Sequence, residues 1–357
     1  MEADLKEEEK QNRLNIFIIW IITGVLAVLT GLLIVLFISF SKTLSRTAAD
    51  STYEKYYVMI VDDPGSSFWK SVYSSALLAA KEQNAYVEMI SDNLSREYSQ
   101  TELMEIAISS GADGIIVTSA EAEGMTELIN KAYDEGIPVI TLMNDNTQSE
   151  RLSFVGIGNY NLGTEYGKLL LEMVKNRLFL HSTIDVTVLL DAGSEDSGQN
   201  VLAAAIQDAV KKDKAENPGT HKPIEISLIA VDASNNFSVE ESVRKLFVSG
   251  QDNIPDIVVC LNENDTNSLY QAVVDYNQVG LVNILGYYDS EAILKGIERD
   301  VIYATISIDT DQMGRYCIDA LTEYYETGNA NQYYTADGYV INKQNIGEYR
   351  KGGADEE

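Results

Sequence analysis

Cysteine and histidine are scarce in this chain of 357 residues, which contains two of each. Cys260 and Cys317 lie in the apolar runs IVVC and YCIDAL, so we expect buried thiols and no disulfide framework. His181 and His221 lie far apart in the sequence, without neighbouring metal-ligand residues. Neither disulfides nor a histidine-bound metal is therefore expected to organise the fold.

Basic residues are also few. Lys and Arg total 26 against 55 Asp and Glu, which gives a formal net charge of −29. A chain with this charge repels polyanions, so we expect no nucleic-acid partner. An acidic surface keeps an exported domain soluble, but it does not identify a ligand.

Motifs for catalysis and for cofactors are missing as well. The sequence holds no Ser/His/Asp set, and an acidic pair such as Asp62-Asp63 is expected by chance in so acidic a chain. GIGNYNLG and LDAGSEDSG contain glycines, but neither is a GxGxxG after a first strand or a P-loop with GK[ST]. The EDS and END runs lack the twelve-residue loop and the glycine of a calcium site. We expect neither an enzyme nor a bound cofactor or metal.

One apolar segment exceeds all others in length. Between residues 14 and 41 no charge interrupts the run LNIFIIWIITGVLAVLTGLLIVLFISFS. A helix needs about 20 apolar residues to cross a bilayer, and this run is too long for the core of a secretory signal. No cysteine follows it for lipid attachment, and SRTAADS is a poor cleavage site. The sequence predicts an uncleaved transmembrane anchor at 14–41.

The flanks of this anchor favour one orientation. Three basic residues precede it and two follow it closely, a slight excess that favours a cytoplasmic N-terminus. Residues 1–13 then form a cytoplasmic tail, and residues 42–55, rich in Ser, Thr and Ala, form a short linker. No later apolar run is as long, so we expect a single-pass cell-membrane protein whose remaining chain is extracytoplasmic.

After the linker, short apolar runs alternate with amphipathic segments. The run YYVMIV predicts a strand that is buried on both faces. Further strands are predicted at AYVEMI, GIIVTS, IPVITL, IDVTVLL, IEISLIAV, DIVVCL, VNILGY, ATISID and GYVINK. Helices are predicted near 68–80, 99–109, 122–135, 160–176, 196–212, 238–248 and 264–277, and over DQMGRYCIDALTEYYE. Strands that each feed a crossover helix imply parallel sheets with helices on both faces.

These units are too many for one modest sheet, so we expect two doubly wound α/β lobes. The helix after ATISID returns the chain to the first lobe and GYVINK crosses once more, which makes a three-segment hinge. The predicted boundaries are a two-lobe domain over 56–349, with lobe 1 at about 56–157 and 309–336, lobe 2 at about 158–307 and 337–349, and a disordered acidic tail at 350–357.

Polar turns follow most of the predicted strands. In doubly wound folds, ligands bind beyond the carboxyl ends of the strands, where loops and helix N-termini converge. The turns that meet this rule are DDPGSSFW, TLMNDN, LDAGSEDSGQN, VDASNN, LNENDTN, GYYDS and SIDTD. If the two lobes face one another, these turns form a cleft.

Several of these segments resemble the type I periplasmic binding proteins, in particular the ribose-binding-protein family of sugar receptors. GADGIIVTSAEAEGMTELINKAYDEGIPVITL (111–142) is the most specific match, and GNYNLGTEYGKLL resembles the crossover into the second lobe. VVCLNENDTNSLYQAV and ILGYYDSEAILKGIERDVIYATISIDTDQMG are similar to the last two βα units in spacing. The resemblance covers about residues 57–349 and implies the same two-lobe fold.

The resemblance also implies binding residues. Family members stack a sugar ring between aromatic side chains, and Phe68 and Trp69, after Ser66 in the polar turn, stand at such positions. Asn262 stands where the family has a cleft asparagine. Elsewhere the sequence departs from the family pattern, because Met143-Asn144 replaces an aspartate–arginine pair, with Asp145 one position further on. The remaining departures are Asn200 in place of an arginine, Tyr288 (beside Asp289) in place of an aspartate, and Ile308 (beside Asp309) in place of a glutamine.

We therefore predict a ligand site formed by Ser66, Phe68, Trp69, Asn144, Asp145, Asn200, Asn262, Tyr288 and Asp309. Each also has a structural alternative. The two aromatic residues could belong to the core, Asn262 could cap the next helix, and Asn144 and Asp145 are turn formers. With fewer charged groups than the family has, the cleft suits a modified sugar or a nucleoside-like ring as well as a sugar.

The expected mechanism is closure of the two lobes around the ligand. The resemblance implies two uses for the closed form. It could deliver a sugar-like solute to the permease of an ABC importer, or it could signal to a membrane sensor histidine kinase. Both remain open from the sequence.

Overall fold

The computed structural model describes Thr30 and residues 53–349, apart from positions 95, 97, 119–121, 193–196, 233–234 and 249–253. The predicted anchor at 14–41, apart from Thr30, and both predicted tails lie outside the described residues. Within the described part of the chain, no helix is both long and apolar enough to span a membrane.

The described chain from Lys55 onward forms two six-stranded sheets. Lobe 1 contains the sheet ordered β11-β5-β4-β3-β1-β2, and lobe 2 contains the sheet ordered β12-β10-β9-β8-β6-β7. The strands of lobe 1 are β1 (Lys55–Ile60), β2 (Ala85–Met89), β3 (Gly114–Val117), β4 (Val139–Leu142), β5 (Ser153–Ile157) and β11 (Tyr333–Ala336). The strands of lobe 2 are β6 (Ile184–Asp191), β7 (Ile224–Val231), β8 (Ile257–Val259), β9 (Asn283–Tyr287), β10 (Ile302–Ile308) and β12 (Gly338–Asn342).

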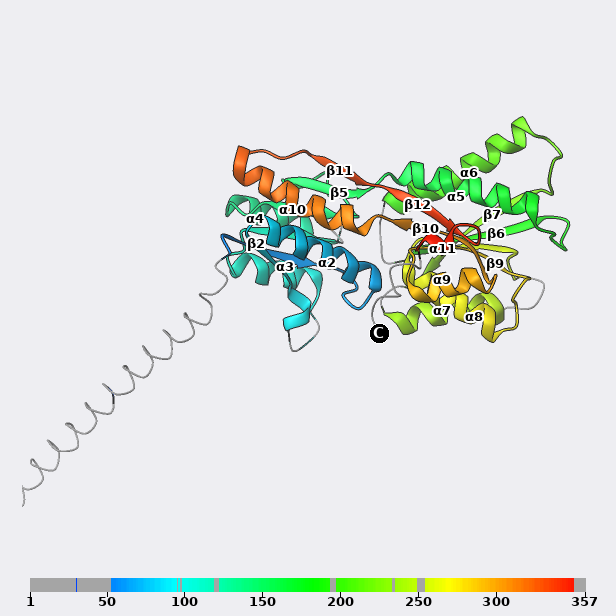
Figure 1. The fold of residues 1–357 in the computed structure, drawn as a ribbon, viewed down its shortest axis with the longest axis horizontal. Coiled ribbons are helices and arrows are strands. Elements are labelled where there is room, and N and C mark those ends of the chain that lie inside the picture. The colour runs from blue at the N-terminus through cyan, green and yellow to red at the C-terminus, as the bar shows by residue number, and fades with distance from the viewer. Residues whose placement is uncertain are drawn as a thin grey trace, which may run out of the picture. The chain divides into compact units, whose positions relative to one another are not determined.

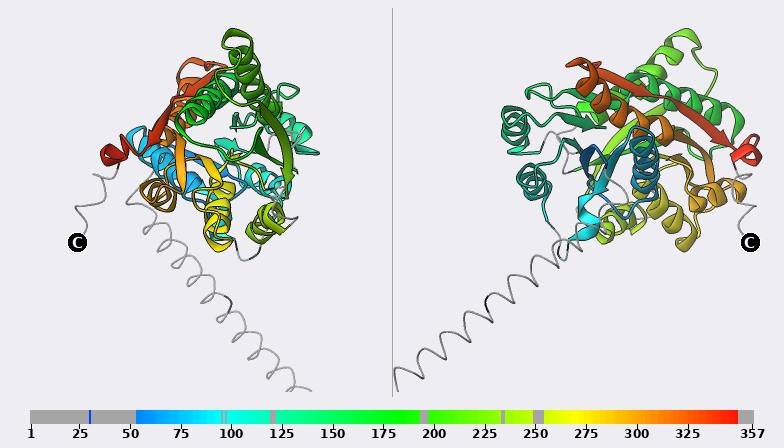
Figure 2. Two further views of the ribbon diagram at one scale, coloured as in Figure 1. Left: turned by 90° about the vertical axis from the view of Figure 1, so that its right-hand side faces the viewer. Right: turned by 60° about the vertical axis from the view of Figure 1, so that its left-hand side comes forward.

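Helices cover both faces of each sheet (Figures 1 and 2). Lobe 1 carries α2 (Ser67–Glu82), α3 (Gln100–Ser109), α4 (Met125–Asp134) and α10 (Thr310–Thr327), with the short 3₁₀ helix η1 (Ile90–Asn93). Lobe 2 carries α5 (Asn159–Asn176), α6 (Ser197–Glu216), α7 (Asn236–Val248), α8 (Glu263–Asp275), α9 (Glu291–Glu298) and α11 (Ile346–Tyr349).

The central strand β1 shows why both faces must be covered. Tyr57 and Met59 point into the core beneath α2, whereas Val58 and Ile60 join a second core beneath α3 and α4. All four side chains are at most 1% exposed. An uninterrupted apolar run is the pattern of a strand that is buried on both faces of a parallel sheet.

Two glycines allow α5 and α6 to pack closely against each other in lobe 2. A Cβ atom at Gly163 would lie 2.3 Å from the carbonyl oxygen of Leu202, and one at Gly167 would lie 2.4 Å from the Cβ of Ala209. Any side chain at these positions would force the two helices apart.

Three segments connect the lobes: β5 to α5, β10 to α10, and β11 to β12. Figure 1 shows β11 and β12 running on from one sheet to the other. Because α10 packs against α2, the middle crossing returns the chain to lobe 1 before the last crossing leaves it again.

The prediction of two α/β lobes with parallel sheets is confirmed, with two differences. The sequence did not predict β5 and β11, which pair with one another at the edge of the lobe 1 sheet. β12 runs antiparallel to β10, so the lobe 2 sheet is mixed at that edge. Cys260 and Cys317 are free and buried, as predicted.

Candidate ligand-binding site

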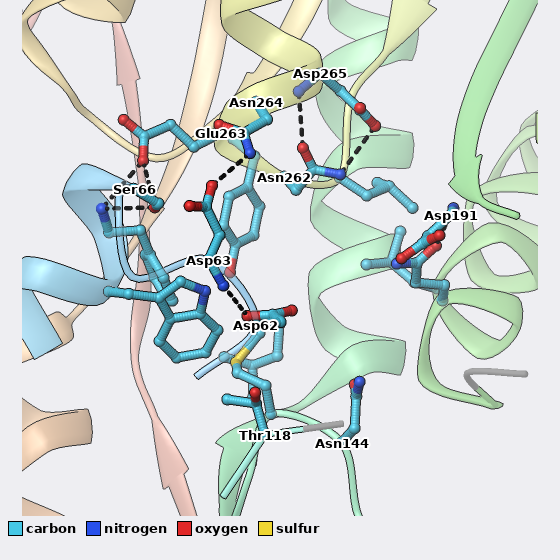
Figure 3. Close-up of a pocket in the computed structure, with 18 of the residues that line it drawn as sticks. Asp62, Asp63, Ser66, Thr118, Asn144, Asp191, Asn262, Glu263, Asn264 and Asp265 are labelled. Carbon is cyan, nitrogen blue, oxygen red and sulfur yellow. Dashed lines mark hydrogen bonds between the residues drawn. The ribbon is translucent and has the colours of Figure 1, made fainter. Parts of the chain in front are cut away.

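A cavity of about 270 Å³ lies between the two lobes (Figure 3). Its lobe 1 wall is formed by Asp62, Asp63, Ser66, Phe68, Trp69, Thr118, Met143 and Asn144. Its lobe 2 wall is formed by Ile157, Asn159, Leu162, Asp191, Gln199, Leu202, Val239, Leu261, Asn262, Glu263, Asn264, Asp265 and Tyr287, where Ile157 lies at the crossing into lobe 2. Most of these residues follow the carboxyl ends of β1, β3, β4, β6, β8 and β9, which is where doubly wound sheets bind ligands.

Glu263 joins the two lobes at the N-terminus of α2. One oxygen of its carboxylate, Oε2, accepts hydrogen bonds from the Ser66 hydroxyl at 2.8 Å and from the Phe68 backbone N–H at 3.0 Å. The N-terminus of a helix presents unpaired N–H groups and positive potential, so it attracts a carboxylate. Nearby, the Asn264 amide donates to Asp63 Oδ2 at 2.7 Å, which adds a second link between the lobes.

Aromatic side chains form one side of the site. Phe68 is 5% exposed and meets Trp69 edge-on, with ring centroids 4.8 Å apart. Its ring also contacts two lobe 2 residues, Tyr287 at 5.9 Å and Tyr288 at 5.2 Å. Trp69 and Tyr287 therefore present ring surface to the cavity while Phe68 packs between them.

Asn262 caps a helix and also lines the cavity, the two roles that the sequence allowed. Its side-chain oxygen accepts from the Asp265 backbone N–H at 2.7 Å and so caps α8. Its amide donates to Asp265 Oδ2 at 2.9 Å, and the residue also lines the cavity. The cap therefore fixes the position of Asp265 at the cavity wall.

The cavity is acidic. Five lining residues are carboxylic acids, namely Asp62, Asp63, Asp191, Glu263 and Asp265, and no described lining residue is Lys or Arg. Protein atoms packed around Asp62 raise its pKa to about 6, a shift to which repulsion from Asp63 and Asp191 contributes. Burial raises the pKa of Asp265 to about 7, and the charge of Asp191 adds to this shift.

The sequence profile of the periplasmic binding protein domain matches residues 57–329, most of the chain. This chain belongs to the type I periplasmic binding proteins. The predicted resemblance is thereby confirmed.

One protein sequence and two solved structures are similar to this periplasmic binding protein. The D-ribose/D-allose-binding protein of Pseudomonas aeruginosa is 21% identical over 273 residues, which cover 73% of this chain and 79% of that protein. The solved structure of XylFII is 25% identical with a TM-score of 0.64, and the match covers 81% of this chain and 99% of XylFII. A solved XylFII–LytSN complex contains a chain that is 23% identical with a TM-score of 0.64, over 81% of this chain and 98% of that one.

Five of the nine predicted site residues line the cavity of this binding protein: Ser66, Phe68, Trp69, Asn144 and Asn262. The structure places the other four, Asp145, Asn200, Tyr288 and Asp309, outside the described cavity wall.

For Asp145, Asp309 and Tyr288, specific contacts account for their positions. Asp145 forms a two-point ion pair with the guanidinium of Arg151, whose Nη2 lies 2.8 Å from Asp145 Oδ2. Asp309 caps α10 by accepting from the Gln312 backbone N–H at 2.9 Å. Tyr288 is 8% exposed, and its hydroxyl donates across the lobes to the Ser67 carbonyl at 3.4 Å.

At two places the residue that lines the cavity is the sequence neighbour of the predicted one. Asn200 is exposed, whereas Gln199 beside it lines the cavity and accepts from the Asp191 backbone N–H at 2.9 Å. Tyr287 lines the cavity where Tyr288 was predicted. Along a helix one step rotates a side chain by about 100°, and along a strand it reverses the face.

The sequence did not single out the acidic wall. Asp191 ends β6, Asp62 and Asp63 lie in the turn after β1, and Asp265 lies in the first turn of the helix that follows β8. The position after a strand was the available signal, and the acidic composition of the chain concealed it.

Proposed function

We propose that this chain is an extracytoplasmic solute receptor that closes its two lobes around a small, sugar-like ligand. The contact of Glu263 with Ser66 and Phe68 carries the proposal, because it joins the lobes directly at the rim of the cavity. A ligand that contacts both walls stabilises this closed arrangement over an open one.

The size and composition of the cavity support a single-ring polar ligand. Its volume of about 270 Å³ is close to the lower end of small-molecule sites, about 300–1,000 Å³. Aromatic surface from Trp69 and Tyr287 suits a ring face, and amides such as Asn144 and Gln199 suit hydroxyl groups. The similarity to a D-ribose/D-allose-binding protein supports the same class of ligand.

Calorimetry on the full chain in detergent tests this proposal. We expect at least one compound in a panel of pentoses, hexoses, aminated sugars and nucleosides to bind, and small-angle scattering to report a more compact molecule when it does. Trp69→Ala and Asn262→Ala should each weaken binding at least about tenfold, whereas Tyr133→Ala, at an exposed site on α4, should not. Binding that is unchanged in both cavity variants would place the site elsewhere.

We propose that the closed, ligand-bound receptor delivers its ligand to the permease of an ABC importer. One observation favours a second candidate, in which the closed form signals to a membrane sensor kinase: the similar protein XylFII is known in a complex with LytSN. Cross-linking in membranes with and without ligand separates the two. Ligand-dependent capture of a permease supports import, and capture of a sensor kinase supports signalling.

We further propose that residues 14–41 anchor the receptor to the membrane with its N-terminus in the cytoplasm. The uninterrupted apolar run supports this assignment. The full chain should sediment with membranes and resist extraction by high salt, while a variant with several Asp substitutions in the run should not. Protease added outside intact cells should cleave the receptor domain, and protection of that domain would reverse the orientation.

A further inference from the structure

Asp265 places a buried acceptor without a partner at the cavity wall. The residue is 1% exposed, and its Oδ2 is held by the amide of Asn262. Its other oxygen, Oδ1, is buried and meets no hydrogen-bond donor among the described residues. An unpartnered buried polar atom costs about 1–3 kcal/mol, more if it is charged. A carboxylate oxygen in this position is suited to a donor that arrives with the ligand.

The hydroxyl of Tyr287 is a second buried polar group without a hydrogen-bond partner among the described residues. Tyr287 also lines the cavity. Tyr287 and Asp265 belong to β9 and α8 of the same lobe. Two uncompensated polar atoms in one wall indicate that the ligand brings polar groups to this side of the cavity.

The charge of the cavity restricts what those groups can be. Besides Asp265, four carboxylic acids line it, and they come from both lobes, so closure brings negative charge together. The lining residues that the structure describes include no cation, and by sequence the masked segments 119–121, 193–196 and 233–234 contain no Lys or Arg. Neighbouring aspartates contribute to the raised pKa values of both Asp62 and Asp265, and Asp265 is in addition buried.

A neutral polyol would satisfy hydrogen bonds but leave this charge uncompensated. A protonated amine supplies three donors and a positive charge together, and its hydrogen bonds to carboxylates are about twice as strong as neutral ones. An ammonium group also interacts favourably with the face of a tryptophan, and Trp69 lines the same cavity. A cationic group therefore fits the acidic and the aromatic walls at once.

We propose that the ligand of this cavity is an amino sugar or a similar aminated ring, and that Asp265 binds its ammonium group. The inference rests on the proposed function, since it names the ligand class of that same site. Asp62, Asp63 and Asp191 provide the surrounding negative potential.

Matched ligands test this directly by calorimetry on the full chain in detergent at pH 7.5. Glucosamine and galactosamine are compared with glucose and galactose, which lack only the amine, and with the N-acetylated forms, which keep the nitrogen but lose its charge. We expect at least one aminated sugar to bind about tenfold or more tightly than both of its neutral counterparts. Equal or tighter binding of the neutral sugar would overturn the inference while leaving the proposed function intact. If none of the sugars bound, the sugar-like ligand and the inference would both be wrong.

A matched pair of variants assigns the effect to its residue. Asp265→Asn keeps the shape of the side chain and should reduce the preference for the aminated sugar at least about tenfold. Asp208→Asn removes one negative charge from the exposed side of α6, where Asp208 is 60% exposed, and should leave the preference unchanged. An unchanged preference in Asp265→Asn, with the variant shown to be folded by circular dichroism, would remove Asp265 from the ammonium site.

Discussion

The carboxylate of Glu263 accepts a hydrogen bond of 3.0 Å from the backbone N–H of Phe68, 195 positions earlier in the sequence. Glu263 opens α8 in lobe 2, and Phe68 lies in the first turn of α2 in lobe 1. The bond therefore exists only when the lobes are together, and its strength contributes to the stability of the closed form.

Replacing Glu263 by Gln should weaken ligand binding about tenfold. Gln keeps an acceptor for the Phe68 N–H but loses the charge that interacts with the helix N-terminus, a difference of about 1 kcal/mol or slightly more. A smaller closed population lowers the apparent affinity. Calorimetry measures the change, with Glu291→Gln in the exposed first turn of α9 as the control. Equal affinity in both variants would mean that the contact does not stabilise closure.

Trp69 should report ligand binding by its fluorescence. The chain has two tryptophans, and the other, Trp20, lies in the apolar run near the N-terminus. In a Trp20→Phe variant the emission therefore comes from the cavity wall alone. A ligand stacked on Trp69 should shift and partly quench this emission, with the same dissociation constant as calorimetry gives. Constant emission at saturating ligand would mean that the ligand does not contact Trp69.

Asp265 should make the free energy of unfolding fall as the pH rises. Its pKa is raised from 3.8 to about 7 in the folded protein. Between these values the folded chain binds more protons than the unfolded chain, so stability decreases with increasing pH. Relative to the wild type, Asp265→Asn should gain up to about 4 kcal/mol between pH 4 and pH 7. Urea unfolding at several pH values measures this gain, and parallel profiles for variant and wild type would contradict it.

Substitution of Asp145 should lower the stability of the fold, whereas substitution of its neighbour Asn144 should lower the affinity for the ligand. Asp145→Asn removes the charge partner of Arg151, whose side chain is only 7% exposed, and should cost about 3 kcal/mol of stability. Asn144→Ala should instead act mainly on ligand affinity, since Asn144 lines the cavity. Urea midpoints and calorimetry on both variants provide the comparison. A larger loss of affinity in Asp145→Asn than in Asn144→Ala would indicate that Asp145 belongs to the ligand-binding site.

Most of the fold could be predicted because the central strands of both sheets are buried on both faces. Runs such as those of β1 and β3 are apolar throughout, and the helices between them have one apolar side. β11 could not be recognised in this way, because three of its four residues are not buried. β5 is short and contains Gly156, which has no side chain to mark a face.

The candidate site could be predicted only in outline. Polar residues after strands were recognisable, and Ser66, Trp69 and Asn262 line the cavity. The acidic wall could not be separated from the general acidity of the chain, since Asp62 and Asp265 differ from other aspartates only in their three-dimensional surroundings. The choice between Gln199 and Asn200 depends on the rotation of α6, which the sequence does not determine within one residue.

The three crossings between the lobes also affect how this protein is made. The lobe 1 sheet is completed only by β11, whose pairing partner β5 lies about half the chain earlier. A growing chain therefore holds an unfinished first lobe until residue 336 has been synthesised. By then every strand of lobe 2 except β12 has already been synthesised. Instead of folding one after the other, as consecutive domains do, the two lobes reach their native pairing together, once β11 and β12 are both available.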